Sequence, residues 1–241
     1  MALKNILVVL AALVSTGSIS QSLKSYEETI PGTSIRFRMV AIPGGSFTMG
    51  SPSTEKGRDP DEGPLKKVQV SAFWMGEHEV TFAEWDAFFK NMKVPQTKNI
   101  AVDAVSRPTA QYIDLTWGMG RDPKNPTNSM SQQAALMYCK WLYEQTGTFY
   151  RLPTEGEWEY GCKGVSTAFG TGGANLAAYG YFKDNSEGKY HKVKELSPNG
   201  WGLFDMLGNL SEWTLDQYDP SALQKLGESA KDPLVPPASR Y

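Results

Sequence analysis

The chain has 241 residues, with 24 lysine and arginine residues against 26 aspartate and glutamate residues, which gives a formal net charge of −2. The length suffices for one large domain or two small ones, and 40% hydrophobic with 21% charged residues excludes a disordered chain. The balanced charge offers no broad basic surface, so we expect no nucleic-acid partner. Two cysteines and two histidines are too few for a disulfide scaffold or a multi-histidine metal centre.

The first twenty residues have the features of a secretory signal peptide. Lys4 precedes an apolar run over residues 6–14, and small polar residues follow up to Ser20. The alternative is a buried N-terminal helix. The apolar run is too short to be a comfortable transmembrane span. We therefore predict that residues 1–20 are removed on export and that the mature protein is secreted or periplasmic, with no membrane segment. Residues 21–36 are expected to form an N-terminal extension.

Strand patterns follow this extension. Residues 37–42 predict a strand, and Pro43-Gly44-Gly45 turns the chain into a second strand near Phe47. Apolar residues alternate with polar ones over residues 68–72, as in a half-buried strand, and residues 73–80 are expected to extend it.

The next segment predicts a helix with an aromatic stripe. Thr81 and Glu84 form a capping box, in which the two side chains bond each other's main-chain N–H groups. Aromatic and apolar residues then recur at helical spacing, which predicts a buried face. These residues are Phe82, Trp85, Phe89 and Met92.

Two further helices carry recognisable caps. Ser131 begins a helix that Gly147 ends, and Thr154 with Glu157 caps a short third helix. Residues 94–128 and 166–180 lack periodicity and are expected to be irregular. One α+β, loop-rich domain with short helices and strands is the predicted fold class. The residues predicted to lie in its core are Trp85, Phe89, Tyr138, Trp141 and Trp158.

Several candidate catalytic motifs have little support. Residues 44–50 lack the Gly-Lys-Ser/Thr of a phosphate loop, and alternation points His78 away from Glu77 and Glu79. The chain contains neither a Gly-x-Ser-x-Gly nor a His-Glu-x-x-His string. Cys139 and Cys162 are expected to be buried, unreactive thiols.

Residues 198–213 are the most informative stretch for a metal site. Asp205 and Glu212 supply hard carboxylate oxygens, and Gly208 permits a tight turn that aims main-chain carbonyls inward. Ca²⁺ prefers six to eight oxygen ligands of these two kinds. The spacing differs from that of an EF-hand, so the residues alone leave open either a calcium site or an aromatic turn with solvated acids.

Five strings in this order resemble the formylglycine-generating enzyme (sulfatase-modifying factor) family. Together they span roughly residues 38–218. They are residues 39–50, 61–64, 79–81, 150–160 and 199–213.

The resemblance implies a C-type-lectin-like α+β fold over residues 37–241 and bound structural calcium. By the family's motif, one Ca²⁺ is held by the Asp205 side chain, the Gly208 and Leu210 carbonyls, and Glu212. A second calcium in the family is held further upstream, where Asn185 and Ser186 are the nearest match.

One departure from the family concerns its catalytic segment. Members close with an Arg-Gly-Gly-Ser-Trp string and a terminal Gly-Phe-Arg, and neither occurs here. The family's redox cysteine pair and copper site lie in that closing segment, so Cys139 and Cys162 are not expected to inherit the role. We expect the segment to be missing after Tyr241, and copper to bind only if a longer chain supplies the pair.

Two functions therefore remain open. The chain is either most of an exported enzyme that oxidises or otherwise modifies a substrate, such as a cysteine of an exported protein or peptide or a small molecule, or a non-catalytic, calcium-stabilised, lectin-like binding or scaffold domain.

Overall fold

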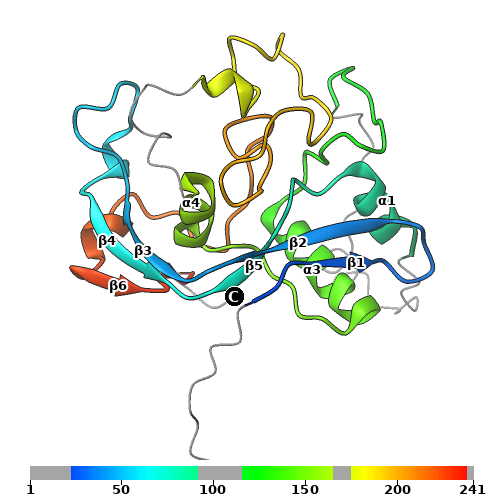
Figure 1. The fold of residues 1–241 in the computed structure, drawn as a ribbon, viewed down its shortest axis with the longest axis horizontal. Coiled ribbons are helices and arrows are strands. Elements are labelled where there is room, and N and C mark those ends of the chain that lie inside the picture. Colours follow the sequence, from blue (N-terminus) through cyan, green and yellow to red (C-terminus); the bar gives the residue numbers. More distant parts are fainter. Residues whose placement is uncertain (1–22, 92–115, 165–174, 238–241) are drawn as a thin grey trace, which may run out of the picture.

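The computed structural model describes residues 23–91, 116–164 and 175–237 (Figure 1). The predicted signal peptide and parts of the two segments predicted to be irregular lie outside these residues. Within them, the strands cross the middle of the view in Figure 1, long coils lie above them, and helices lie on both sides of the strands.

The first sheet is antiparallel. It contains β1 (Tyr26–Thr29), β2 (Arg36–Ile42) and β5 (Phe73–Gly76), in the order β1-β2-β5. Residues 37–42 thus form the predicted strand. β1 comes from the stretch expected to be an N-terminal extension, and it pairs with β2 along its whole length.

The second sheet contains β3 (Gly45–Met49), β4 (Lys66–Val70) and β6 (Ser229–Lys231). β3 pairs antiparallel with β4, and β6 lies parallel to β4 on its other side. The link between β2 and β3 is only Pro43-Gly44, so the two sheets are neighbours.

One strand prediction was wrong. Residues 73–80 do not extend the strand before them, because β4 ends at Val70 and β5 belongs to the other sheet. At the break, the Ser71 main-chain N–H and hydroxyl both donate to the Asp232 carboxylate, at 2.6 and 2.7 Å. Alternating polarity predicts an extended chain but cannot reveal to which sheet each part pairs.

The three predicted helices are confirmed with their caps. α1 spans Phe82–Asn91, α3 spans Gln132–Thr146, and α4 spans Glu155–Lys163. Thr154 and Glu157 form the reciprocal capping box expected of them. The remaining short elements are η1 (Pro60–Glu62), η3 (Leu176–Ala178) and α5 (Ala222–Lys225).

Two hydrophobic clusters form the core. The helical core joins α1 and α3 to the first sheet, and its buried members are Ile30, Phe37, Phe88, Tyr138, Trp141 and Leu142. The second-sheet core lies between β3, β4, α4 and α5, and its buried members are Val40, Ile42, Met49, Val68, Val70, Tyr160, Leu203, Met206 and Leu223.

The core predictions were correct for Tyr138 and Trp141, each 6% exposed. Trp85 and Trp158 are only half-buried, although each packs against one of the two clusters. Phe89 was predicted wrongly, because Phe88 occupies the buried position and is 1% exposed. The helix turns Phe82, Trp85 and Phe88 inward, so the inward side matches the predicted stripe at Phe82 and Trp85 and differs from it in burying Phe88 in place of Phe89.

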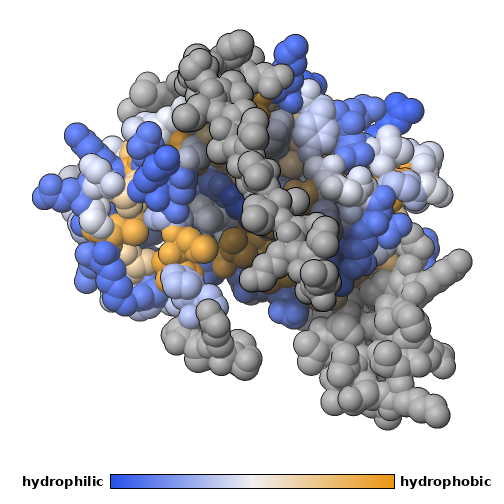
Figure 2. Space-filling model, turned by 90° about the horizontal axis from the view of Figure 1, so that it is seen from below, coloured by the Kyte–Doolittle hydropathy of each residue, from blue (hydrophilic) through white to orange (hydrophobic). Residues whose placement is uncertain are grey.

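The surface carries some large apolar side chains. Figure 2 shows apolar residues gathered on the face seen from below, around the strands. Exposed residues in or next to these strands are Leu65, Trp74 and Leu234. No helix in the described part of the chain is both long and apolar enough to cross a bilayer.

Candidate functional site

The loop of residues 205–212 has a tightly constrained backbone. Asp205 and Asn209 both have positive φ angles, of 60° and 63°, in the left-handed region that asparagine and aspartate tolerate better than most residues. Gly208 has a φ of 156°, and a Cβ atom there would lie 1.9 Å from the Tyr181 carbonyl oxygen. Only glycine therefore permits this close approach of two main-chain segments.

Asn209 ties the loop to two other segments. Its side-chain oxygen accepts the His191 main-chain N–H at 2.8 Å, and its Nδ2 donates to Glu79 Oε2 at 2.7 Å and to the His191 carbonyl at 3.1 Å. Glu79 Oε1 accepts the Leu210 main-chain N–H at 3.0 Å. One amide and one carboxyl group thus join the loop, residues 190–195 and the chain after β5.

Asp205 is the most deeply buried of the predicted calcium ligands, at 2% exposed. Its Oδ2 accepts the Lys194 main-chain N–H at 2.9 Å, whereas its buried Oδ1 has no hydrogen-bond partner. Burial raises the pKa of Asp205 above its ordinary value, and the Lys194 hydrogen bond partly opposes this rise. A buried carboxylate oxygen without a donor favours a bound cation at this position.

Glu212 lies at the end of the same loop, close to Trp158. Its Oε2 accepts the Trp158 indole N–H at 3.3 Å. The surrounding protein raises the pKa of Glu212 to about 7, mainly by removing water from around the carboxyl group. Glu212 nevertheless keeps accessible surface and lines a cavity, so water in that cavity will reduce the rise.

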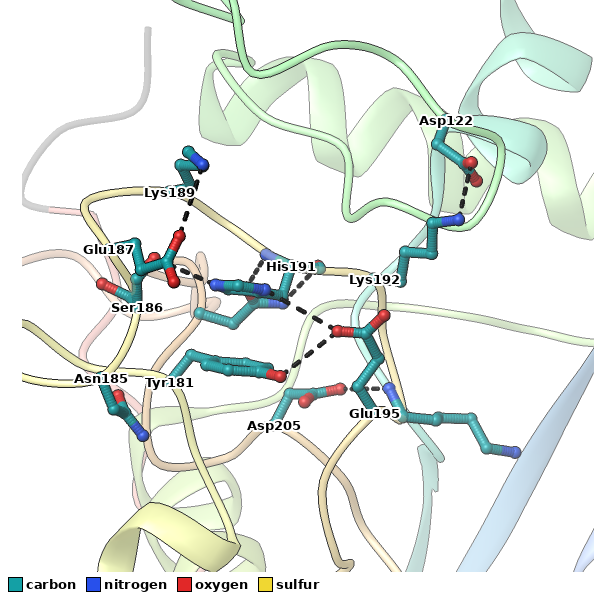
Figure 3. Close-up of polar contacts among 12 residues, drawn as sticks. Asp122, Tyr181, Asn185, Ser186, Glu187, Lys189, His191, Lys192, Glu195 and Asp205 are labelled. Carbon is teal, nitrogen blue, oxygen red and sulfur yellow. Dashed lines mark hydrogen bonds and ion pairs between the residues drawn. The ribbon is translucent and has the colours of Figure 1, made fainter.

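Asn185 and Ser186 lie in a separate turn. Asn185 Oδ1 accepts the Phe182 main-chain N–H at 2.7 Å, and its Nδ2 donates to the Gly180 carbonyl at 3.0 Å. The Ser186 carbonyl lies 3.0 Å from His191 Nε2. In Figure 3, the Tyr181 ring, which stacks on His191 with centroids 3.7 Å apart, lies between Asn185 and Asp205. This turn contacts the 205–212 loop through Tyr181, whose carbonyl accepts the Asn209 main-chain N–H at 2.7 Å.

The 205–212 loop fits calcium by the chemistry of its donors. Nowhere in residues 23–91, 116–164 and 175–237 do three acidic, histidine or cysteine side chains form a metal-binding group. Two carboxylates with two main-chain carbonyls are instead a donor set that suits Ca²⁺, which readily takes carbonyl oxygens. The unpaired Oδ1 of Asp205 supports the same conclusion.

A cavity of about 240 Å³ lies beside this loop. Its walls include members of both hydrophobic clusters, so it lies at their boundary. Glu79, Glu84 and Glu212 contribute acidic side chains to the lining, and Cys139 contributes a thiol. Pockets between packed units are common ligand sites in proteins.

Neither cysteine has the properties of a redox-active thiol. Both are free, and burial raises the pKa of each to about 11. Cys162 Sγ also donates to the Met206 carbonyl at 3.3 Å. A reactive cysteine requires thiolate character, which both of these lack at neutral pH.

Sequence reasoning missed the importance of Glu79, Glu84 and Asn209. The sequence offers Glu79 only as a neighbour of His78 in a metal motif with little support, and His78 Nδ1 lies 2.7 Å from the Glu79 carbonyl oxygen. For Glu84 it indicates only a capping role. No local pattern marks these residues as partners, because the hydrogen bonds of Asn209 and Glu79 join positions about 130 residues apart.

Comparisons with known proteins identify the family. Residues 30–233 match the sulfatase-modifying factor enzyme 1-like domain. The chain is 27% identical to the formylglycine-generating enzyme of Bos taurus, over 84% of this chain and 63% of that protein. It is 28% identical to the inactive C-alpha-formylglycine-generating enzyme 2 of Bos taurus, over 75% of this chain and 71% of that protein. The chain thus spans less than two thirds of the length of the first of these relatives.

A solved structure gives the same result for the fold. PvdO from Pseudomonas aeruginosa superimposes with a TM-score of 0.65 at 27% identity, over 84% of this chain and 78% of PvdO. The α+β, loop-rich fold class predicted from the sequence is therefore confirmed. The chain belongs to the sulfatase-modifying factor enzyme 1-like domain family.

Proposed function

We propose that this chain is an exported binding domain of the sulfatase-modifying-factor type, in which the described residues perform no thiol oxidation. The observation that carries this proposal is the state of its two cysteines. Burial raises the pKa of both thiols to about 11, so at pH 8 roughly one thiol in a thousand is ionised. The cavity beside the 205–212 loop supplies a place for a ligand.

The second candidate function is oxidation of a cysteine in an exported protein or peptide. It is favoured by the similarity to the bovine formylglycine-generating enzyme, although an inactive relative is equally similar. Such an activity would need a redox-active cysteine pair, with its copper, from a chain longer than these 241 residues. The whole protein's substrates are part of this second proposal.

One assay separates the two functions when it is run on these 241 residues and on the full-length product. A sulfatase-type cysteine peptide is incubated with the protein and copper, and its conversion to the aldehyde is followed by mass spectrometry. We expect no aldehyde, and no change on Cys139→Ser or Cys162→Ser. Turnover that either substitution abolishes would overturn the binding-domain proposal.

Thiol labelling tests the physical basis of this expectation. Iodoacetamide at pH 8 should label both cysteines at least about 100-fold more slowly than a free cysteine, because only the thiolate reacts. Since the pKa of each thiol is raised, the labelling rate should increase as the pH rises toward 11. Rapid labelling of either cysteine at pH 8 in the folded protein would contradict the proposal.

We further propose that Ca²⁺ stabilises the 205–212 loop through Asp205, Glu212 and the carbonyls of Gly208 and Leu210. Ca²⁺ should then raise the melting temperature, because it binds the folded state preferentially. Asp205→Ala should abolish the rise, whereas Asp184→Ala, which alters an exposed acid in a nearby turn, should retain it. If a second Ca²⁺ binds at Asn185 and Ser186, Asp205→Ala should keep part of the Ca²⁺-dependent rise in melting temperature.

Export is proposed from the signal-like residues 1–20, which predict a secreted or periplasmic protein. Mass spectrometry of the native protein should find its N-terminus near Gln21. An intact Met1 on a cytoplasmic protein would exclude export.

A further inference from the structure

The cavity at the boundary of the two clusters has walls of mixed character. Apolar and aromatic residues form most of its lining, and members of both clusters are among them, including Trp85 of α1, Tyr138 of α3 and Trp158 of α4. Trp213, which is 48% exposed, also lines it. Its size and aromatic walls suit a small organic molecule with an apolar body.

The positive charges in the lining are already engaged. Arg151 forms two parallel bonds to Glu157, at 2.6 and 2.7 Å. Arg38 lies 3.8 Å from Glu77, and Lys194, outside the lining, also bonds Glu77. The arginines of the lining therefore have carboxylate partners of their own.

Two buried acids of the lining lack such partners. Glu79 is 8% exposed and Glu84 is 5% exposed, and neither forms an ion pair within the described residues. Donors to Glu79 are the amide of Asn209 and the Leu210 main-chain N–H. Neither acid therefore has a lysine or arginine partner among the described residues, and the charge of His78 acts on Glu84 only in part.

Glu84 presents a free acceptor at the cavity. Its Oε2 accepts the Thr81 main-chain N–H at 2.9 Å and the Thr81 hydroxyl at 2.7 Å. Its Oε1 accepts no hydrogen bond from any residue in the described ranges. Burial raises the pKa of Glu84, and the nearby His78 only partly offsets this rise. Because Glu84 Oε1 is not among the fully buried atoms without a partner, a donor in the cavity can reach it.

We propose that this cavity binds a small organic ammonium ion, whose cationic head contacts Glu84 and whose apolar body packs against the tryptophan and tyrosine walls. An ammonium group supplies both the positive charge and the N–H donors that Glu84 Oε1 lacks. The aromatic rings add cation–π attraction and apolar contact. This inference rests on the proposed binding function, because it names the ligand class of the same cavity.

Three probes of similar shape test the charge preference on the unaltered protein. They are phenethylamine, the neutral 2-phenylethanol and the anionic 3-phenylpropanoate, compared by titration calorimetry and by the fluorescence of the cavity tryptophans. We expect phenethylamine to bind at least about tenfold more tightly than the alcohol and the anion to bind least, since each charge-assisted hydrogen bond favours the cation. Equal binding of amine and alcohol, or no binding of the amine, would overturn the proposal.

A substitution then locates the head group. Glu84→Gln should weaken phenethylamine binding about tenfold and leave 2-phenylethanol binding unchanged. Glutamine still serves in a capping box, so the start of α1 should be retained. Glu144→Gln, in an exposed pair with Lys140 on α3, is the matched control and should bind as the parent does. Unchanged amine binding in folded Glu84→Gln would contradict the assignment.

A further probe, N-acetyl-lysine methylamide, distinguishes a lysine side chain from a free small amine as the source of the ammonium group. Tighter binding of this probe than of phenethylamine indicates a lysine side chain, and the reverse indicates a free amine; both keep the ammonium assignment. The cavity test is independent of the aldehyde assay. Aldehyde formation with ammonium binding would refute only the binding-domain proposal, whereas absence of both would refute only the ligand assignment.

Discussion

The helical core and the 205–212 loop are held together by different forces. In the helical core, aromatic rings of α1 and α3 contact one another, and Phe88 lies within 6 Å of both Tyr138 and Trp141, measured between ring centroids. In the loop, positive φ angles and long-range side-chain hydrogen bonds fix the chain. The difference shows that burial of apolar side chains stabilises the helical core, whereas hydrogen bonds to buried polar groups stabilise the 205–212 loop.

The arrangement of the two regions explains their roles. In Figure 1, α1 and α3 lie against the first sheet, whereas the coils of residues 180–215 lie above and between the helices. Polar groups buried in irregular coil need partners, because no helix or sheet ladder satisfies them. Those same polar groups then become available to bind a cation or a ligand at the loop.

The largest effect is expected in the helical core. Trp141→Ala removes a ring that is 6% exposed and should lower the free energy of unfolding by about 3–5 kcal/mol, measured by urea denaturation. Trp117→Ala, at a residue 81% exposed, is the control and should cost less than about 0.5 kcal/mol. Similar costs for the two would mean that the helical core does not depend on this burial.

The next effect is expected in the loop. Asn209→Gly removes three hydrogen bonds without straining the positive φ angle, and it leaves Glu79 and His191 short of partners. We expect a loss of about 2–4 kcal/mol, because buried groups are left unsatisfied. Asn175→Gly, where the side chain makes no capping bond and is exposed, should cost much less. A negligible cost for Asn209→Gly would mean that side-chain hydrogen bonds do not stabilise the 205–212 loop, contrary to the contrast drawn with the helical core.

A smaller effect is expected at the start of α4, next to both regions. Thr154→Ala removes the hydroxyl that accepts the Glu157 main-chain N–H at 3.1 Å and should cost about 1–2 kcal/mol. Thr154→Ser keeps the capping oxygen and should recover most of this stability. If serine fails to recover it, packing of the threonine methyl group, rather than capping, stabilises the helix start.

The smallest effect is expected at the end of α3. Gly147 has a φ of 77°, and a Cβ atom added there would have no neighbour within 4 Å, so Gly147→Ala tests backbone strain alone. We expect a cost of about 1 kcal/mol, and less for Gly147→Asn, because asparagine adopts this conformation more readily. Thermal denaturation of the two variants measures the difference. If Gly147→Ala cost as much as Trp141→Ala, local backbone geometry would stabilise the domain as much as burial of the tryptophan does.

Local features of the sequence predicted the helices well. Ser131 and Gly147 bracket α3, and Thr154 caps α4, because capping uses residues three or four positions apart along the chain. One inward position of α1 was predicted wrongly. Its stripe offers apolar residues at both Phe88 and Phe89, and only packing against Tyr138 and Trp141 selects Phe88.

The site was less predictable than the helices. The sequence singled out Asp205, Gly208 and Glu212, whose residue types suit a turn with oxygen donors, and the structure places an unpaired, buried Oδ1 on Asp205. It did not indicate that Glu79 binds this loop or that a cavity lies beside it. Those features depend on contacts between segments about 130 residues apart, which no local pattern encodes.

The sequence by itself determined the caps, the strand at residues 37–42, the glycine needed at position 208 and the family to which the five strings belong. Only the tertiary structure decided which sheet receives residues 73–76, which phenylalanine of α1 is buried, and which acids surround the cavity. The physical reason is the distance along the chain over which each interaction acts. Dihedral preferences and caps act over a few residues, whereas sheet pairing, burial and the balance of buried charge are set by groups that meet only when the chain folds.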